Sequence, residues 1–228
     1  MIDFHSHFLP DIDDGAKSVE ESIAMLSDSY LQGVSTCVAT PHCVLHHEDS
    51  IKNFLRRREK SLNLLTESIQ EIDVPKLIMG AEVYFDNDLS ECPDIKSLCL
   101  GDSPYLLLEF PHTGVLPRSF DWIYELTLCG IRPVIAHIER YPEREMILNS
   151  LTELDIIYQI NATSFLSFSG RRVIRSLLKH DVPYVVSSDM HNISTRPSKL
   201  KDAYIKAKRL FPDICNELFL NSEKLIIK

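Results

Sequence analysis

Short apolar segments alternate with longer amphipathic segments along almost the whole sequence, and this alternation restricts the fold more than any other feature. The apolar segments predict strands at residues 2–6, 35–40, 76–84, 105–110, 132–137, 156–161 and 183–188. The amphipathic segments predict helices at 18–33, 50–72, 117–129, 142–152, 163–180, 198–210 and 212–219, with a further helical turn or two after Asn221. This order is typical of an α/β fold with a largely parallel sheet.

About seven strand-like segments in this order favour a (β/α) barrel over an open doubly wound sheet, which is the structural alternative. The 228 residues predict one domain, because no linker, repeat or low-complexity stretch divides them. The basic run Arg56–Arg58 is interpreted as the solvated face of the long helix at 50–72.

The carboxyl ends of the predicted strands carry histidines and acids. His5 and His7 close the first strand, and residues two apart project from the same face of a strand. A loop with three aspartates follows, and later strand ends supply His42, Glu82, Glu109, His137, Asp189 and His191. In a parallel barrel these ends meet at one face, so the recurrence predicts a metal site there.

The chemistry of these side chains narrows the metal and the reaction. Imidazole and carboxylate ligands without thiolates suit manganese, iron, magnesium or zinc better than they suit a structural zinc cage. The candidate ligands exceed what one tetrahedral ion can use, so we expect two or three divalent ions bridged by carboxylates. Such a cluster activates water and stabilises both oxygens of an in-line displacement, which is typical of phosphate-ester hydrolysis.

Two arginines follow candidate ligands closely. Arg140 comes three residues after His137, and Arg196 comes five residues after His191. Planar guanidinium groups bind phosphate oxygens in a bidentate manner, so both are candidate phosphate-binding residues.

Other phosphatase chemistries lack their motifs. No arginine stands six residues after any of the six cysteines, as a cysteine-based phosphatase would require. No G-x-x-x-x-G-K-[ST] loop is present. Asp11-Ile-Asp13 only faintly resembles an aspartate-nucleophile motif, and that mechanism would leave the histidines unexplained.

Charge and cysteine usage indicate compartment and partners. The net charge is −9, and residues 1–50 carry a single base, Lys17, among nine acids, so a nucleic-acid partner is not expected. The scattered cysteines read as reduced thiols, which favours the cytoplasm. No signal-peptide pattern and no membrane-spanning apolar run is present, so direct membrane insertion is not expected.

The motifs occur in an order that resembles a known family along nearly the whole chain. They are His5-Ser-His7, Asp13-Asp-Gly15, Ala39-Thr-Pro-His42, Gly80-Ala-Glu82, Glu109-Phe, Ala136-His-Ile-Glu-Arg-Tyr141, Gln159-Ile-Asn161 and Ser188-Asp-Met-His-Asn192. The chain is similar to the bacterial metal-dependent protein-tyrosine phosphatases of the polymerase and histidinol phosphatase (PHP) superfamily, which are associated with capsular and exopolysaccharide synthesis.

This resemblance implies a distorted (β/α)7 barrel and a trinuclear centre, commonly of manganese. The implied ligands are His5, His7, Asp14, His42, Glu82, Glu109, His137, Asp189 and His191. Arg140 and Arg196 would hold the phosphate. The implied substrate is phosphotyrosine on the tail of a membrane-associated tyrosine autokinase, and homo-oligomers occur in the family.

The chain departs from the family pattern in two places, after His42 and in the loop 111–117. His46, His47, His112 and His180 match no family ligand and are interpreted as surface or packing residues. Two alternatives stay open at this point. One is a histidinol-phosphatase-like hydrolase of a small phosphate ester, and the other is a non-catalytic regulatory module that binds metal.

Overall fold

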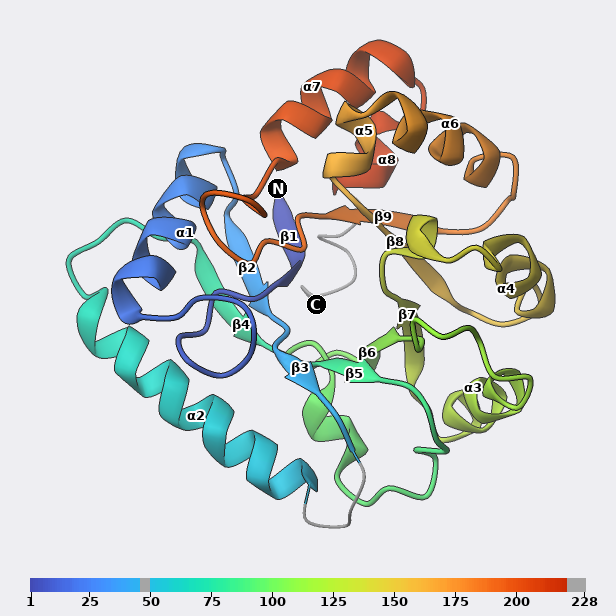
Figure 1. The fold of residues 1–228 in the computed structure, drawn as a ribbon, viewed down its shortest axis with the longest axis horizontal. Coiled ribbons are helices and arrows are strands. Elements are labelled where there is room, and N and C mark those ends of the chain that lie inside the picture. Colours follow the sequence, from blue (N-terminus) through green and yellow to red (C-terminus); the bar gives the residue numbers. More distant parts are fainter. Residues whose placement is uncertain (46–49, 221–228) are drawn as a thin grey trace.

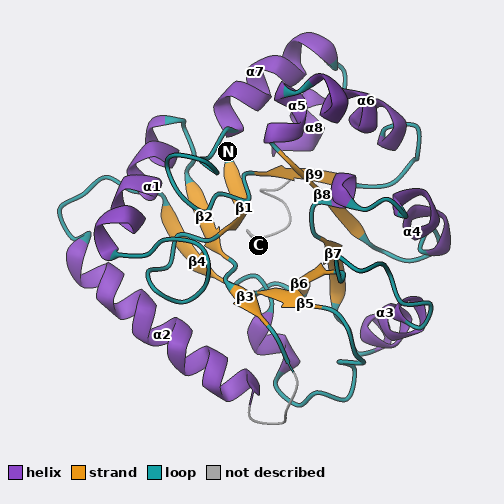
Figure 2. Cartoon of the chain, viewed as in Figure 1, coloured by secondary structure: helices purple, strands orange, loops and turns teal. Residues whose placement is uncertain are grey.

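The computed structural model describes residues 1–45 and 50–220 and contains parallel strands surrounded by helices (Figures 1 and 2). The strands are β1 (Ile2–Ser6), β2 (Thr36–Ala39), β3 (His42–Cys43), β4 (Lys76–Met79), β5 (Glu82–Tyr84), β6 (Tyr105–Glu109), β7 (Arg132–Ile135), β8 (Ile157–Asn161) and β9 (Tyr184–Ser187). The helices are α1 (Val19–Leu31), α2 (Ser50–Ser68), α3 (Ser119–Leu128), α4 (Arg144–Ser150), α5 (Thr163–Leu166), α6 (Phe168–Leu177), α7 (Leu200–Leu210) and α8 (Cys215–Leu220), with short 3-10 turns η1 (Ile95–Leu98) and η2 (Ile138–Arg140). Within the described ranges, no helix has the length and apolar character needed to cross a membrane.

Two positions in the ring are each occupied by two short strands with a bend between them. The predicted strand 76–84 becomes β4 and β5, and the chain that follows β2 continues as β3. Strands β1, β2 and β4 form one sheet, and β3, β5, β6, β7, β8 and β9 form the other. Pro41 marks one bend, because proline cannot donate to a ladder. Gly80 marks the other, where an added Cβ would lie 2.6 Å from the Leu100 side chain.

The two ends of the ring of strands meet between β1 and the segment that follows β9. Ser6 and Met190 form an isolated parallel bridge. The Asp189 amide donates to the His5 carbonyl at 2.9 Å, and the His7 amide donates to the Met190 carbonyl at 2.9 Å. With β2–β3 and β4–β5 counted as single bent strands, the described strands occupy seven positions in parallel order. The predicted distorted (β/α)7 barrel is confirmed.

The apolar core has two parts on either side of the strands. A small cluster takes its members from strands all around the ring, so it fills the barrel interior: Ile2, Phe4, Val38, Leu100, Tyr105, Leu107, Val134, Ala136, Ile157 and Val185. A larger cluster lies between the strands and the outer helices. The pairing of β1 with β2 changes register between Asp3 and Ser6. That irregularity allows consecutive residues, Phe4 and His5, both to face the interior, where polar groups replace the apolar cluster at the carboxyl end.

Several sequence predictions need correction at the helices. The predicted helix 163–180 is two helices, because Ser167 has an extended backbone and its side chain accepts from the Gly170 amide. The long helix α2 ends at Ser68 rather than at residue 72. Its basic run is not only a solvated face, since Arg57 donates to the Ile12 carbonyl and Arg58 donates to the Gly80 carbonyl at 2.6 Å. The predicted turns after Asn221 lie outside the described residues.

Candidate metal centre

All nine candidate ligands meet at the carboxyl end of the barrel. They come from loops and strand ends that lie up to 186 positions apart in the sequence. The nine residues are His5, His7, Asp14, His42, Glu82, Glu109, His137, Asp189 and His191. Eight of them fall into three overlapping groups whose ligand atoms lie within 4.8 Å of one another. The ninth, His137, places Nε2 at 3.1 Å from Glu82 Oε1 and 3.4 Å from Glu109 Oε1. The convergence predicted from the strand ends therefore occurs.

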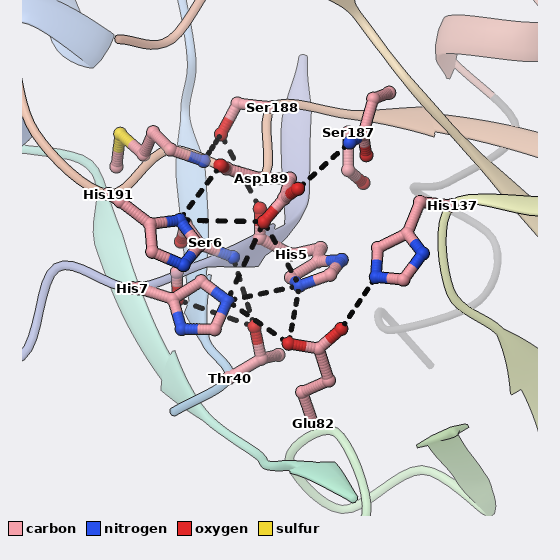
Figure 3. A network of polar contacts seen from close by, with 12 residues as sticks. His5, Ser6, His7, Thr40, Glu82, His137, Ser187, Ser188, Asp189 and His191 are labelled. Atoms are coloured by element: carbon pink, nitrogen blue, oxygen red, sulfur yellow. Dashed lines mark hydrogen bonds and ion pairs between the residues drawn. The ribbon is translucent and has the colours of Figure 1, made fainter. Parts of the chain in front are cut away.

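The first group consists of His5, His7 and Asp189, which point toward one another in Figure 3. The Nε2 atoms of the two imidazoles lie 3.1 Å apart. Asp189 Oδ1 is 3.6 Å from His5 Nε2 and 3.7 Å from His7 Nε2. All three side chains are buried, so the two ring nitrogens and the carboxylate oxygen bound a small space beneath the surface of the protein.

The second and third groups extend this space outward. Asp14 Oδ1 lies 3.2 Å from His42 Nε2 and 3.4 Å from His191 Nε2. On the other side of the same imidazole, His42 Nδ1 lies 3.0 Å from Glu82 Oε2 and 3.7 Å from Glu109 Oε2. His42 therefore stands between two groups, and Asp14 forms the exposed edge of the centre.

Glu82 is the central carboxylate. Its Oε2 atom lies within 3.3 Å of a ring nitrogen of each of His5, His7 and His42. The residue is only 1 % exposed, and within the described part of the chain Oε2 has no hydrogen-bond partner. A buried carboxylate oxygen without a donor is costly unless a cation offsets its charge. The buried Nε2 of His191 likewise has no hydrogen-bond partner among the described residues, so the side chains fit bound divalent ions.

The side chains by themselves hold positive charge on two of the histidines. Burial lowers the pKa of His7, but the hydrogen bond with Asp13 and the negative charges of Asp13 and Glu82 raise it to about 10. Burial likewise lowers the pKa of His137, and its contacts with Glu109 and Glu82 raise it to about 9. At neutral pH both imidazoles therefore carry protons as long as no other cation balances the carboxylates.

Binding of Mn²⁺ at pH 7.5 is expected to release protons, because a metal binds only the neutral imidazole. The pKa values of His7 and His137 lie above that pH, so apparent Mn²⁺ affinity should rise as pH rises toward 9. Titration calorimetry in two buffers with different ionisation enthalpies measures the proton count. Equal apparent enthalpies in the two buffers would contradict the expectation.

The loop after β1 holds Asp13 behind His7. Asp13 Oδ2 lies 2.7 Å from His7 Nδ1 and accepts from the His42 amide at 3.0 Å, so His7 Nε2 is left to face the centre. Gly15 is required at the end of this loop, because a Cβ there would lie 2.1 Å from the His7 carbonyl oxygen. The loop thus brings Asp14 to the centre while Asp13 orients a ligand.

The backbone at two candidate ligands is left-handed. His137 has φ 31° and Asp189 has φ 53°, values that are uncommon for residues other than glycine. Each of them stands two positions after the last residue of a strand, namely Ile135 of β7 and Ser187 of β9. Strained conformations of this kind concentrate at functional sites and persist only where surrounding contacts hold them.

The two predicted phosphate-binding arginines lie together beside Asp189. Arg140 Nη2 is 2.8 Å from Asp189 Oδ2, and Arg196 Nη2 is 3.1 Å from both oxygens of that carboxylate. Their side chains are 42 % and 37 % exposed. Both line an open cavity of about 580 Å³ above the centre, together with Ile12, Asp13, Asp14, His42, Val44, Glu82, Tyr84, Glu109, His112, His137 and Asp189.

The other histidines behave differently from one another. His180 is paired with Glu145 at 2.8 Å, away from the centre. His112 is exposed but lines the cavity, with Nε2 at 3.7 Å from Glu109 Oε1. His112 is therefore a surface residue, as expected, but it also lies beside the centre. His46 and His47 lie outside the described residues.

A cysteine nucleophile finds no support at the centre. Cys43 directly follows His42, but its thiol is buried, and that burial raises its pKa to about 12. A thiol with such a pKa is protonated at neutral pH and is a poor nucleophile. This agrees with the missing C-x5-R motif.

Gln159 and Asn161 belong to one of the sequence motifs, but the sequence alone predicts no role for them. Gln159 Oε1 lies 3.2 Å from His5 Nδ1, and Asn161 Nδ2 donates to Asp189 Oδ2 at 2.8 Å. Asp3 and Ser188 were also missed, although Asp3 accepts from both the amide and the hydroxyl of Ser188. The available signal was the same for all four, namely a polar residue inside or at the end of an apolar strand.

Comparison with known proteins identifies relatives over the full length of the chain. The family model for capsular polysaccharide synthesis, CpsB/CapC, matches residues 1–228. The tyrosine-protein phosphatase CpsB of Streptococcus pneumoniae is 36 % identical over 245 residues, covering 100 % of this chain and 98 % of its own. The tyrosine-protein phosphatase YwqE of Bacillus subtilis is 31 % identical over 235 residues, covering 99 % and 91 %.

Solved structures agree with these sequence relatives. One crystal structure from a study of YwqE and CpsB, described there as unique metal-dependent tyrosine phosphatases, superposes with a TM-score of 0.80 at 29 % identity, covering 99 % of this chain and 94 % of that chain. A TatD family hydrolase from Entamoeba histolytica superposes with a TM-score of 0.57 at 14 % identity, covering 100 % and 98 %, which shows likeness of fold alone. The resemblance that the motifs indicate is confirmed.

Proposed function

Because this chain belongs to the CpsB/CapC family of capsular polysaccharide synthesis, we propose that it is a metal-dependent tyrosine-protein phosphatase. The observation that carries the proposal is the convergence of nine imidazole and carboxylate side chains, six of which line one open cavity together with two arginines. The metal ligands would be His5, His7, Asp14, His42, Glu82, Glu109, His137, Asp189 and His191. They would hold two or three divalent ions, with manganese first and iron, magnesium or zinc as alternatives.

When bound, such ions lower the pKa of a water molecule and offset negative charge on the phosphate oxygens. Arg140 and Arg196 would bind the phosphate, since their guanidinium groups line the cavity and present planar donors. Glu82 would remain ionised throughout, because His5, His137 and His42 outweigh the effect of burial and hold its pKa well below the usual range.

The leaving group of phosphotyrosine needs little help from the protein. A phenol has a pKa of about 10, so the phenolate can depart without a dedicated general acid. Ile12, Val44 and Tyr84 line the open cavity and offer apolar and aromatic surface for the tyrosine ring. An aryl phosphate on a protein segment therefore fits this centre better than a small alkyl phosphate such as histidinol phosphate.

The natural substrate would be the phosphotyrosine-bearing tail of a membrane-associated tyrosine autokinase in capsular or exopolysaccharide synthesis. The family match to capsular polysaccharide synthesis supports this assignment. Such a tail is presented at the cytoplasmic side of the membrane, so the enzyme would act in the cytoplasm.

Hydrolysis of a phosphotyrosine peptide is expected to be lost on chelation and restored by Mn²⁺. Treatment with a cysteine-alkylating reagent should leave the rate unchanged, because no thiolate takes part. The assay measures phosphate release, with defined metals, from phosphotyrosine peptide, phosphoserine peptide and histidinol phosphate. Activity that persists in chelator would refute the metal mechanism, and preference for histidinol phosphate would favour the alternative hydrolase. Binding of metal without turnover of any of these substrates would indicate a regulatory module.

A further inference from the structure

Among the seven strand positions formed by the described residues, β8 is the one whose carboxyl end carries none of the nine candidate ligands. It carries Gln159 and Asn161 instead, two residues apart and therefore on the same face. Gln159 is 0 % exposed and Asn161 is 2 % exposed. Two amide side chains so deeply buried beside a charged centre must have their hydrogen bonds satisfied by specific partners.

The orientation of both amides is determined from the two ends of the chain of hydrogen bonds. Gln159 Oε1 accepts from the main-chain N–H of His137 at 2.6 Å, and a main-chain N–H can only donate. Asn161 Nδ2 donates to Asp189 Oδ2 at 2.8 Å, and an ionised carboxylate can only accept. Between these ends, Gln159 Nε2 donates to Asn161 Oδ1 at 2.7 Å. Neither amide can flip without creating two repulsive contacts.

This orientation selects the tautomer of His5. The same Gln159 Oε1 that accepts from His137 lies 3.2 Å from His5 Nδ1, so Nδ1 must carry the hydrogen. The lone pair is then on Nε2, which faces Glu82 Oε2 and Asp189 Oδ1. A metal ligand needs this unprotonated nitrogen directed at the ion.

The other contacts of Gln159 and Asn161 hold the His137 backbone and the Asp189 carboxylate in place. The bond to the His137 amide anchors the left-handed residue that precedes η2. The bond from Asn161 holds Oδ2 of Asp189, so that Oδ1 is the oxygen nearer to His5 and His7. One strand thus contacts three candidate ligands that come from three other parts of the chain.

We propose that Gln159 and Asn161 are positioning residues that arrange His5, His137 and Asp189 for metal binding, with Gln159 selecting the Nδ1–H tautomer of His5. The inference rests on the proposed metal centre. Neutral amides suit this role, because they set direction without adding charge to a centre that already has four carboxylates. The two residues have separable effects because, of the two, only Gln159 contacts His5 and only Asn161 contacts Asp189.

Two variants separate these effects, and a third serves as the control. Gln159→Met removes the acceptor at His5 and His137 with little change of volume. Asn161→Ala removes the donor at Asp189 and the acceptor of Gln159 Nε2, while the main-chain N–H of His137 still holds Gln159 Oε1. Tyr158→Phe is the matched control on the neighbouring residue of the same strand, because the buried Tyr158 hydroxyl has no hydrogen-bond partner within the described residues.

Metal affinity and tautomer are the two measurements. Competition with a fluorescent chelator should show Mn²⁺ affinity weakened about 10- to 100-fold in Gln159→Met and in Asn161→Ala, and unchanged in Tyr158→Phe. Nitrogen-15 spectra of the histidine rings, with Zn²⁺ as a diamagnetic probe, should show loss of the uniform Nδ1–H state of His5 in Gln159→Met only. Thermal unfolding of the metal-free variants verifies that each is folded.

The outcomes distinguish this inference from the proposed function. Wild-type protein that neither binds Mn²⁺ nor hydrolyses aryl phosphate would overturn the proposed function. Wild-type protein that does both, with Gln159→Met and Asn161→Ala binding Mn²⁺ as tightly as Tyr158→Phe does, would overturn only the positioning role. If Gln159→Met does not fold, Asn161→Ala still decides, because it must lose affinity while His5 keeps its tautomer.

Discussion

Replacing Glu82 by glutamine is expected to lower kcat/KM for phosphotyrosine peptide by about 10³-fold or more, because removing one charge from a buried ionic cluster costs several kcal/mol. The substitution keeps the shape of the side chain and removes its charge. Glu82 Oε2 lies within 3.3 Å of three imidazoles and Oε1 lies 3.1 Å from His137 Nε2, so the neutral side chain would remove a negative charge that four histidines share. Metal affinity should fall together with activity.

Metal content after gel filtration and the rate at saturating Mn²⁺ measure the two effects separately. Glu145→Gln is the matched control, because Glu145 is an exposed acid that also pairs with a histidine, His180, but lies outside the centre. That control should keep wild-type metal content and rate. A Glu82→Gln protein with wild-type metal content and activity would contradict the central position of this carboxylate.

Replacing Arg140 by lysine is expected to lower kcat/KM by about 10²- to 10³-fold, as loss of a preorganised donor to a transition-state anion does. Lysine keeps the charge but lacks the planar fork that binds two phosphate oxygens at once. Arg140 is held at 2.8 Å from Asp189 Oδ2, so its guanidinium is already oriented beside the centre. A flexible ammonium group would have to be ordered when the substrate binds.

Inhibition by inorganic phosphate, measured beside peptide turnover, checks whether the loss comes from anion binding. The inhibition constant should weaken in Arg140→Lys. Arg132→Lys supplies the control, because Arg132 forms an exposed ion pair with Asp155 at the amino end of β7. Wild-type phosphate inhibition and turnover in Arg140→Lys would exclude the guanidinium from phosphate binding.

Much of the fold was predictable because its signals are local. Buried parallel strands are short apolar runs, and the predicted strand at 105–110 corresponds closely to β6. The bends were not predictable in the same way. Gly80 and Pro41 are weak signals by themselves, and the close approach of Leu100 to Gly80 joins parts of the chain far from each other in sequence. The division of the predicted helix 163–180 depends on a single serine cap, which periodicity does not reveal.

For the candidate centre, the sequence by itself determined which side chains could bind a metal, because their type and their position at strand ends are properties of each segment alone. The tertiary structure decided how they are held. Only there does β8 supply amides that orient ligands on other strands, and only there do Arg140 and Arg196 meet at Asp189. Both features depend on the ring in which β9 lies between β8 and β1. They also depend on the contacts of Gln159 with His5, of Asn161 with Asp189 and of Arg140 with Asp189, which join residues more than 20 positions apart in sequence. No local sequence pattern encodes which distant residues come into contact. His5 and His7, near the start of the chain, therefore form part of a defined centre only because the barrel brings Asp189 and Gln159 beside them.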